Sequence, residues 1–212
     1  MLKKNISLYY ILLFVCLSFC LFPRQILPAE SVRVTGVIDG DTIVLSDGQR
    51  VRYLGIDAPE MGKDGPADFL AQESTQFNRR LVLKKEVRLV YGEEKRDRYD
   101  RLLAYVFLDN GVFVNGELVK QGLAKVLYHG PRMERFDELL QFQREAIQDS
   151  RGIWAKAFKE SEDRYRGQVH TRRFHRLDCP LGKNISPKNL ILFQSKKEAY
   201  WQGFSPCRNC KP

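Results

Sequence analysis

Five charged residues that could do chemistry lie close together in one segment of the chain: Asp39, Asp41, Arg52, Asp57 and Glu60. Hard carboxylate oxygens gathered in one place suit Ca²⁺ or Mg²⁺. An arginine beside a hard cation is the combination that a phosphate group requires. These residue types therefore predict a metal-assisted reaction on a phosphate, if the fold brings them together.

A β-hairpin would bring them together. The dipeptide Asp47-Gly48, between alternating apolar residues, predicts the tight turn. The strand expected after the turn, Val51–Ile56, is apolar on both faces except at Arg52. A guanidinium cannot lose its charge and is costly to bury without an anionic partner. Folding the hairpin places Asp41, near the start of one strand, beside Asp57–Glu60 at the end of the other.

A second charged segment, Gly92–Arg101, leads into an expected strand, Leu102–Leu108, which a turn signal follows. Four motifs occur in order along the chain: Asp39-Gly40-Asp41-Thr42; Arg52 with Asp57-Ala58-Pro59-Glu60; Asp97-Arg98-Tyr99-Asp100-Arg101 with Leu103-Ala104-Tyr105; and Gln121-Gly122-Leu123-Ala124-Lys125-Val126 with Tyr128. With these motifs the chain resembles the staphylococcal nuclease (thermonuclease) family over roughly residues 32–154. One such motif is weakly specific, but four in sequence are highly specific.

The resemblance implies a fold and a reaction. The fold is a five-stranded OB-fold barrel with packed helices, mostly β within the α+β class. The reaction is hydrolysis of phosphodiester bonds in DNA, RNA or both by an endonuclease-like phosphodiesterase. By the resemblance, Asp41 and Asp57 hold one catalytic Ca²⁺, helped by the backbone carbonyl of Ala58, and Glu60 orients or deprotonates the attacking water.

The same resemblance assigns two arginines and two tyrosines to the substrate. Arg52 and Arg101 bind the phosphate and stabilise the developing charge, while Tyr99 and Tyr128 line the nucleotide pocket. These roles agree with the physics, because a phosphoryl transition state gains negative charge, and fixed cations then stabilise it more than the ground state. A carboxylate within reach of water can act as a general base. Asp39 is expected to have a structural or supporting role.

Each of these residues also has a structural interpretation. Asp57-Ala58-Pro59 could be a turn that ends a strand, and Arg101 could be a solvated member of the charged run Lys95–Arg101. Neither interpretation gives a reason for Arg52 inside an apolar strand. An alternative function from another class is a non-catalytic OB-fold protein that binds nucleic acid. A binding-only descendant would be expected to lose part of the set, and this chain retains all of it.

Three amphipathic stretches predict helices packed on the barrel, at residues 66–82, 115–121 and 133–150. Gly122 is the expected C-terminal stop of the second helix. Gly152 and Trp154 close the unit, and Trp154 is expected to dock on the barrel. The nuclease-like domain is therefore expected over residues 30–155, a normal size for one domain.

The first 29 residues read as a targeting segment. Lys3 and Lys4 precede an apolar run, Leu8–Phe22, which is typical of a signal peptide. The alternative is an uncleaved anchor, a membrane tether through residues 5–22, because the run approaches the lower limit for a bilayer span. Either way the enzyme is expected outside the cytoplasm, secreted or periplasmic. No protein partner is implied.

The charge of the chain indicates a polyanionic partner. The chain carries 35 Lys and Arg against 26 Asp and Glu, and residues 1–29 hold three of the basic residues and no acid, so the remainder keeps 32 − 26 = +6. A basic surface around an acid-lined metal pocket suits nucleic acid. Moderate positive charge can also serve solubility alone, so charge by itself does not decide the function.

The C-terminal region predicts a separate metal site. Residues 156–168 are rich in charge, lack a sustained apolar stripe and indicate a linker or helix end. Residues 169–212 contain three thiols, which cannot all pair within one molecule. Three thiolates and one imidazole would complete a tetrahedral Zn²⁺ shell: His175, Cys179, Cys207 and Cys210. This unit resembles small zinc modules related to the metal-binding domain of the Ada repair protein.

The expected zinc-binding unit is a small α+β module, with a strand at Leu190–Phe193 and a helix at Lys196–Gln202 that a capping box from Ser195 opens. A structural Zn²⁺ would stabilise a unit whose apolar core is so small. The alternatives are a Cys207–Cys210 disulfide and dithiol redox chemistry, and His170 is a weaker candidate ligand. The module could only stabilise the tail, or it could bind nucleic acid through basic side chains: Arg172, Arg173, Lys183 and Lys188.

Overall fold

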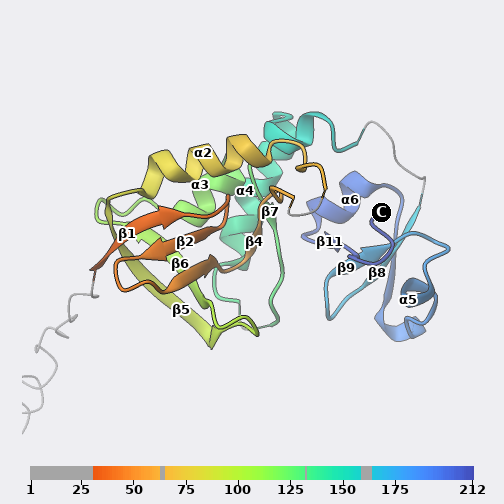
Figure 1. Cartoon of the computed structure of the whole chain (residues 1–212). Coiled ribbons are helices and arrows are strands. Elements are labelled where there is room, and N and C mark those ends of the chain that lie inside the picture. The colour runs from red at the N-terminus through yellow and green to blue at the C-terminus, as the bar shows by residue number, and fades with distance from the viewer. Residues whose placement is uncertain (1–30, 63–64, 132, 159–163) are drawn as a thin grey trace, which may run out of the picture.

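The computed structural model describes residues 31–62, 65–131, 133–158 and 164–212, and in it two units lie side by side (Figure 1). The targeting segment predicted at residues 1–29 lies outside the described residues. In the described part of the chain, no helix combines the length and the apolar character that a membrane span needs.

The first unit is a closed barrel of five strands, which confirms the predicted barrel. Its strands are β1 (Ser31–Val37), β2 (Thr42–Leu45), β3 (Arg50–Tyr53), β5 (Glu86–Arg96) and β6 (Leu102–Leu108). Around the barrel the order is β1-β2-β3-β6-β5, and all neighbours are antiparallel except β3 and β6. The interior is filled by β-branched side chains such as Val34, Ile43 and Val106, all fully buried.

The predicted hairpin between β2 and β3 is confirmed, with Gly48 at a positive φ of 82° in the turn. The single strand expected at Val51–Ile56 was wrong, because the chain bends at Gly55. There φ is 83°, a left-handed conformation that glycine adopts without steric cost. The chain leaves the barrel and continues as β4 (Ile56–Asp57), which pairs with β7 (Lys125–Val126).

Three helices pack on the barrel as predicted: α2 (Ala71–Val82), α3 (Val114–Lys120) and α4 (Phe136–Gln148). Two of them begin later than expected from residues 66 and 133. In α2 the reason is Leu70, whose φ of 65° cannot continue a right-handed helix toward its N-terminus. Gly122, with φ of 65°, follows the end of α3 as predicted. In Figure 1, α4 lies between the barrel and the second unit.

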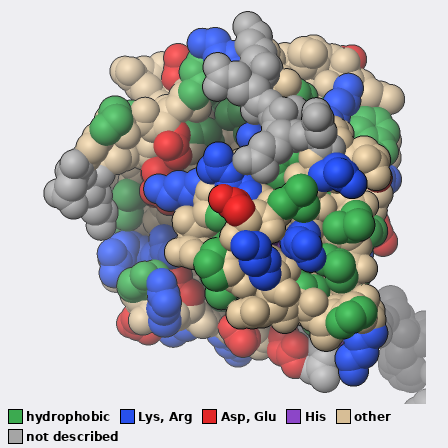
Figure 2. Space-filling view, turned by 90° about the vertical axis from the view of Figure 1, so that its right-hand side faces the viewer, with side chains coloured by type: hydrophobic (Ala, Val, Ile, Leu, Met, Phe, Trp, Pro, Cys, Tyr) green, Lys and Arg blue, Asp and Glu red, His purple; other side chains and the backbone are tan. Residues whose placement is uncertain are grey.

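The second unit is a four-stranded sheet in the order β10-β8-β9-β11 with short helices around it. Its elements are β8 (Tyr165–Gln168), β9 (Arg173–His175), α5 (Pro180–Lys183), η3 (Pro187–Asn189), β10 (Leu190–Phe193), α6 (Lys196–Trp201) and β11 (Ser205–Pro206). Lys and Arg side chains spread over its outer face (Figure 2). The predicted strand at residues 190–193 is confirmed, and Ser195 Oγ accepts a hydrogen bond from the Glu198 amide at 3.1 Å, as expected for the helix cap.

The interpretation of residues 156–168 as linker or helix end was wrong for the last four residues, which form β8. This strand pairs with β9 on one side and β10 on the other. Only Tyr165 and Gly167 of β8 are buried. An alternation of two residues is too short to distinguish a central strand from a charged loop, and pairing with distant segments decides the conformation.

The two units share an apolar cluster. It joins Ala146 and Ile147 of α4 and Trp154 of η2 (Gly152–Ala155) to side chains of the second unit, among them Phe174 and Tyr200. The ring centroids of Trp154 and Tyr200 lie 5.0 Å apart. Trp154 therefore docks on the second unit, and the prediction that it docks on the barrel was wrong, because the sequence does not show which apolar surface lies nearest.

Gln143 is buried, and its side-chain amide forms hydrogen bonds with both units. Its Oε1 accepts from the Val126 amide at 2.7 Å, and its Nε2 donates to the Tyr200 carbonyl at 2.6 Å. Since an unpaired buried amide is costly, this pair of bonds ties the position of the second unit to β7.

Candidate active site and metal cluster

Arg52 lies between two carboxylates at the end of the hairpin. Its side chain is 11% exposed, with Nη1 at 2.9 Å from Asp41 Oδ2 and Nη2 at 3.0 Å from Asp57 Oδ1. Nη1 also donates to the carbonyls of Tyr53 and Ile56, at 3.1 and 2.9 Å. The anionic partner expected for this arginine is thus present twice, and the structure brings Asp41, Arg52 and Asp57 together.

Asp41 is a buried carboxyl in a network of short hydrogen bonds. Its Oδ2 accepts from the Ala58 amide at 2.7 Å, and its own amide donates to Asp39 Oδ1 at 3.0 Å. Burial raises the pKa of Asp41 to about 7 in spite of the opposing charge of Arg52, and Asp39 raises it further. A carboxyl in this condition is short of positive charge, so an added cation would be favourable there.

Lys125 is a second cation in the site, and sequence reasoning named it only as a member of a motif. β7 pairs with β4 in a register that sets Lys125 opposite Asp57, and Lys125 Nζ lies 3.1 Å from Asp57 Oδ2. Burial raises the pKa of Asp57, but Lys125 and Arg52 together hold it below its ordinary value. Each strand of this pair has two residues, which is too short for a strand pattern to reveal.

Glu60 follows Asp57 by three residues and is exposed to solvent. Asp68 fixes its backbone, because the Glu60 amide donates to Asp68 Oδ2 at 3.0 Å and the Asp68 amide donates to the Glu60 carbonyl at 2.9 Å. The carboxylate of Glu60 forms no ion pair with the described residues. The sequence offered no signal for Asp68, which closes this loop from a distance.

Arg101 stands at the entrance to β6, two residues before Leu103, the strand partner of Arg52. Because β6 begins at Leu102, the strand partner of Val51, the backbone of Arg101 lies beside the strand that carries Arg52. Asp97 holds Arg101 in place, with Arg101 Nη2 at 2.7 Å from Asp97 Oδ2. The ring of Tyr99, 57% exposed, lies beside Arg101 with 5.5 Å between Cζ and the ring centroid.

Tyr128 lies where the barrel meets the second unit. Its ring packs edge-on against Phe136, with centroids 5.3 Å apart. The guanidinium of Arg172 covers the same two rings, with Cζ 5.2 Å from the Tyr128 centroid and 4.6 Å from that of Phe136. Contact between Tyr128 and the second unit was not expected from the sequence.

A cavity of about 340 Å³ opens beside these residues. Its lining includes Leu54, Leu103, Tyr105, His129 and Met133. One lining residue, Leu103, is the strand partner of Arg52, while the residues of the arginine–carboxylate cluster do not themselves line the cavity. Burial lowers the pKa of His129 to about 4, helped by the charge of Arg52, so this ring is neutral at neutral pH.

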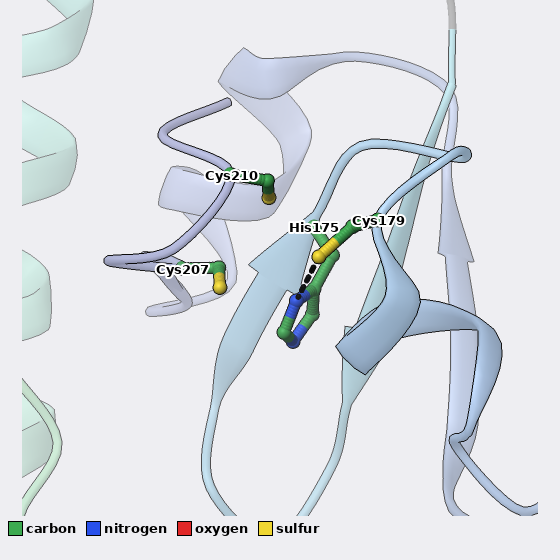
Figure 3. A group of neighbouring side chains, drawn as sticks. All are labelled: His175, Cys179, Cys207 and Cys210. Atoms are coloured by element: carbon green, nitrogen blue, oxygen red, sulfur yellow. Dashed lines mark hydrogen bonds between the residues drawn. The ribbon is translucent and has the colours of Figure 1, made fainter.

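The second unit holds a cluster of three thiols and one imidazole (Figure 3). The ligand atoms of His175, Cys179, Cys207 and Cys210 all lie within 4.8 Å of one another. His175 ends β9, Cys179 precedes α5, and the other two follow β11. Cys179 Sγ lies 3.5 Å from His175 Nδ1. The structure thus brings the four predicted ligands together, in an arrangement that could hold one Zn²⁺.

The pKa shifts of His175 and Cys179 favour the protonation states that a metal site needs. Burial lowers the pKa of His175, and Arg173 lowers it further, so the imidazole is neutral, as a ligand must be. Burial opposes ionisation of Cys179, but hydrogen bonds that include one from the Gly182 amide outweigh it and lower its pKa. Burial and the neighbouring thiols raise the pKa of Cys210 to about 12, so this thiol would become the thiolate that zinc binds only with the cation beside it.

The alternatives for this region do not match the geometry. All described cysteines are free thiols, so Cys207 and Cys210 do not form a disulfide. They lie in a turn after β11, without the strand-to-helix setting of a dithiol redox motif. The alternative ligand His170 is outside the cluster, with Nε2 at 3.0 Å from Asn189 Oδ1.

The barrel and the arginine–carboxylate cluster define a class of protein. A guanidinium held between two carboxylates, with another arginine at the start of the neighbouring strand, is an arrangement for binding and polarising a phosphodiester. The class is that of barrel enzymes that hydrolyse phosphodiester bonds.

Comparison with known proteins gives the family. The family described as "Staphylococcal nuclease homologue" matches residues 50–156, and the chain belongs to this family. Similar relatives include a thermonuclease of Staphylococcus hyicus, 36% identical over 130 residues, which are 59% of this chain and 76% of that protein. A thermonuclease of Staphylococcus intermedius is 38% identical over 131 residues, 60% and 77% of the two chains. Endonuclease YncB of Bacillus subtilis (strain 168) is 36% identical over 133 residues, 60% and 63% of the two chains.

A second family, described as "Metal binding domain of Ada", matches residues 155–212 and so includes all four clustered ligands. Both resemblances found in the sequence motifs are therefore confirmed. With its fold and its family, the chain is a hydrolytic nuclease, and its substrate is nucleic acid.

Proposed function

We propose that the chain is a Ca²⁺-dependent nuclease whose reaction is carried out by one cluster of side chains: Asp41, Arg52, Asp57, Glu60 and Arg101. The observation that supports this most is the contact of Arg52 with both Asp41 and Asp57, at 2.9 and 3.0 Å. It sets the candidate phosphate-binding group and the candidate metal ligands at one point.

The donor set fits a hard divalent cation. Asp41 and Asp57 offer carboxylate oxygens around one point, and burial leaves Asp41 short of positive charge. We assign the backbone carbonyl of Ala58 as the third protein ligand. Ca²⁺ accepts about six to eight oxygen ligands in flexible geometry, so water and substrate phosphate would supply the rest. When bound, Ca²⁺ would polarise the phosphate and offset its charge.

The side chains of this chain then have distinct roles. Arg52 and Arg101 bind the phosphate oxygens and stabilise the negative charge that grows in the transition state. Glu60 accepts a proton from the attacking water. Its exposure, on a loop that Asp68 closes, supports this role because water can reach the carboxylate.

We assign Tyr99, Tyr128 and the cavity beside Leu103 to the nucleotide. The ring of Tyr99 is 57% exposed and has the guanidiniums of Arg98 and Arg101 beside it, so a base or sugar at this ring would also meet positive charge. The cavity has a volume of about 340 Å³ and a partly apolar lining, which suits a nucleoside. Tyr128 would contact the substrate together with Arg172, which covers its ring.

We further propose that His175, Cys179, Cys207 and Cys210 bind a structural Zn²⁺. The proposed domains are the nuclease domain at residues 30–155 and the zinc module, which we define as residues 164–212 so that it includes β8. The linker that the sequence predicts at residues 156–168 is therefore shorter and ends at residue 163.

Export of the enzyme is a separate proposal, supported by the basic and then apolar N-terminal sequence. The chain would be secreted or periplasmic, either cleaved near residue 29 or tethered through residues 5–22. Cell fractionation and mass spectrometry of the N-terminus test this. Recovery of the intact chain in the cytoplasm would contradict it.

Cleavage assays on single- and double-stranded DNA and on RNA test the function, with Ca²⁺, with Mg²⁺ and with no added divalent metal. We expect Ca²⁺-dependent cleavage that Arg52→Ala lowers by about 10³-fold, since a fixed charge at the developing negative charge is lost. Arg33→Ala is the matched control, because Arg33 is an exposed strand arginine near the hairpin turn, at the other end of β2 from Asp41. Binding without cleavage under every metal would favour the alternative, a non-catalytic nucleic-acid-binding protein.

A further inference from the structure

The positive charge of this chain is unevenly divided between its two units. Residues 31–163 carry 21 Lys and Arg against 23 Asp and Glu, whereas residues 164–212 carry 11 against two. The nuclease part therefore has no positive excess with which to attract a polyanion. The excess belongs to the zinc module, where basic side chains spread over the face in Figure 2.

One edge of the module's sheet lies against the candidate active site. Ser205 Oγ in β11 donates to the Val126 carbonyl at 2.9 Å, and Val126 follows Lys125, which pairs with Asp57. Within the module, Ser205 is the strand partner of Arg173 in β9. Because neighbouring strands lie about 4.8 Å apart, this chain of contacts directs Arg173 toward the Asp57 end of the site.

The charges of the site reflect this proximity. Burial raises the pKa of Asp57, but neighbouring cations that include Arg208 hold it low. Burial and Arg208 lower the pKa of Arg173, while Asp57 raises it. Burial and nearby cations, Arg173 and Arg208 among them, lower the pKa of His129. The geometry agrees, because the Cys207 amide donates to the Phe174 carbonyl at 2.9 Å, so Arg208 directly follows the residue that bonds the strand of Arg173.

Neither arginine has a carboxylate partner within the described residues. Arg173 Nη1 donates to the Pro206 carbonyl at 3.1 Å, and Arg208 is exposed. Two neighbouring guanidiniums repel each other, and an anion between them would relieve that repulsion. Cys207 lies between Pro206 and Arg208, so a metal at Cys207 would hold both arginines in position.

We propose that Arg173 and Arg208 form a second phosphate subsite of the nuclease, which binds the phosphate next to the scissile one on the same nucleic-acid strand. The inference rests on the proposed function, because it assigns residues of the zinc module to the substrate of that site. The barrel then supplies the reacting groups, and the module supplies binding at the adjacent phosphate.

Two lysines of the module provide a matched control. Lys183 ends α5 and Lys188 lies in η3, and both are exposed. η3 leads into β10, which is at the opposite edge of the sheet from β11. Removing these two lysines takes the same charge from the module as removing the two arginines, but at a distance from Asp57.

The test is binding of a fluorescein-labelled single-stranded oligonucleotide to the full module-containing chain, measured by anisotropy at several salt concentrations without added divalent metal. Arg173→Ala with Arg208→Ala should weaken binding and reduce the slope of log Kd against log salt by about 0.7, the value for one lost phosphate contact on a single strand. Lys183→Ala with Lys188→Ala should leave the slope unchanged. Equal slopes for the two double variants would overturn the subsite, since only general attraction would then be present.

Zinc content and thermal unfolding of each variant show whether the module is still folded, and Arg173→Lys with Arg208→Lys keeps the charge and should restore most of the slope. The binding readout separates this inference from the catalytic one. If the wild-type chain binds but never cleaves, and only the arginine variant has the lower slope, the subsite is supported and the proposed function is refuted. A wild-type chain that cleaves, with KM and slope unchanged in the arginine variant, refutes the subsite alone.

Discussion

The barrel and the zinc module are stabilised in different ways. The barrel encloses a large apolar cluster with members from all five strands, so its polar site stands at the edge of a scaffold that forms without it. The module has helices of four and six residues, and its apolar cluster is completed by side chains of α4 and η2. The barrel can therefore carry chemistry on its own core, whereas the module completes its apolar cluster with side chains of the first unit and, by our proposal, with a metal.

The two regions also divide the electrostatics. The barrel holds buried carboxylates around Arg52, and its overall charge is close to neutral. The module holds the basic excess and no acidic cluster in its described residues. By our proposals the module attracts the polyanion and the barrel reacts with it, and the two units meet at β7 and β11.

The largest expected effect is loss of the module's fold when its metal site is removed. Structural Zn²⁺ contributes about 10–16 kcal/mol of apparent binding free energy in small zinc-dependent domains. Cys207→Ser should therefore remove zinc and make the module sensitive to trypsin, while the barrel remains resistant. Zinc analysis and limited digestion of the whole chain measure this, with His170→Ala as a control that keeps its zinc. If the module lacked zinc but remained resistant to trypsin, contacts with α4 would be sufficient for its fold. The proposed difference between the barrel and the module would then be wrong.

The next effect tests the barrel's chemistry apart from its stability. Glu60→Gln should lower kcat by about 10²–10⁴-fold, the usual contribution of a general base, while the melting temperature stays unchanged because Glu60 is exposed. Glu73→Gln, an exposed carboxylate on α2, should leave kcat unaffected. Undiminished cleavage by the Glu60 variant would remove this residue from the role of base.

A smaller effect tests the contact between the regions through pH. Burial lowers the pKa of His129 from 6.5 to about 4, so the unfolded chain takes up a proton at a higher pH than the folded chain. The stability that depends on neutral His129 is complete above pH 6.5 and is lost as the pH falls toward 4, and the loss is modest because His129 is exposed and solvent screens its charge.

Urea unfolding at pH 7 and pH 4.5 measures this dependence. His129→Gln should lose less stability than the wild type between the two pH values, whereas His170→Gln, beside Asn189 and away from Arg52, should behave as the wild type. Identical losses in all three proteins would show that the surroundings of His129 do not suppress its protonation.

The smallest effect concerns a local feature of the module. Ser195→Ala removes the cap hydrogen bond to the Glu198 amide and should destabilise the module by about 1 kcal/mol. Ser186→Ala is the matched control, because Ser186 precedes η3 without a side-chain cap bond. Thermal unfolding of the zinc-loaded chain distinguishes the two. Equal shifts would mean that the cap bond contributes nothing in this context.

Features that depend on neighbours in the sequence were predictable. The Asp47-Gly48 turn, the helix after Ser195 and the strand at residues 190–193 follow from local backbone preferences, and all three are present. Gly55 shows the limit of this reasoning. A glycine within an apolar run fits a strand pattern, yet its φ of 83° turns the chain out of the barrel.

The sequence by itself determined the chemistry that depends on residue type. It supplied the carboxylates and arginines of one site and the three thiols and imidazole of the other, because metal and phosphate ligands are limited to a few kinds of side chain. Only the tertiary structure decided which other groups join them. Lys125 with Asp57, Trp154 with Tyr200, and Arg172 over the ring of Tyr128 are contacts between segments far apart in the chain. Such contacts arise when strand pairing and apolar burial close the fold, and no local pattern of residues encodes them.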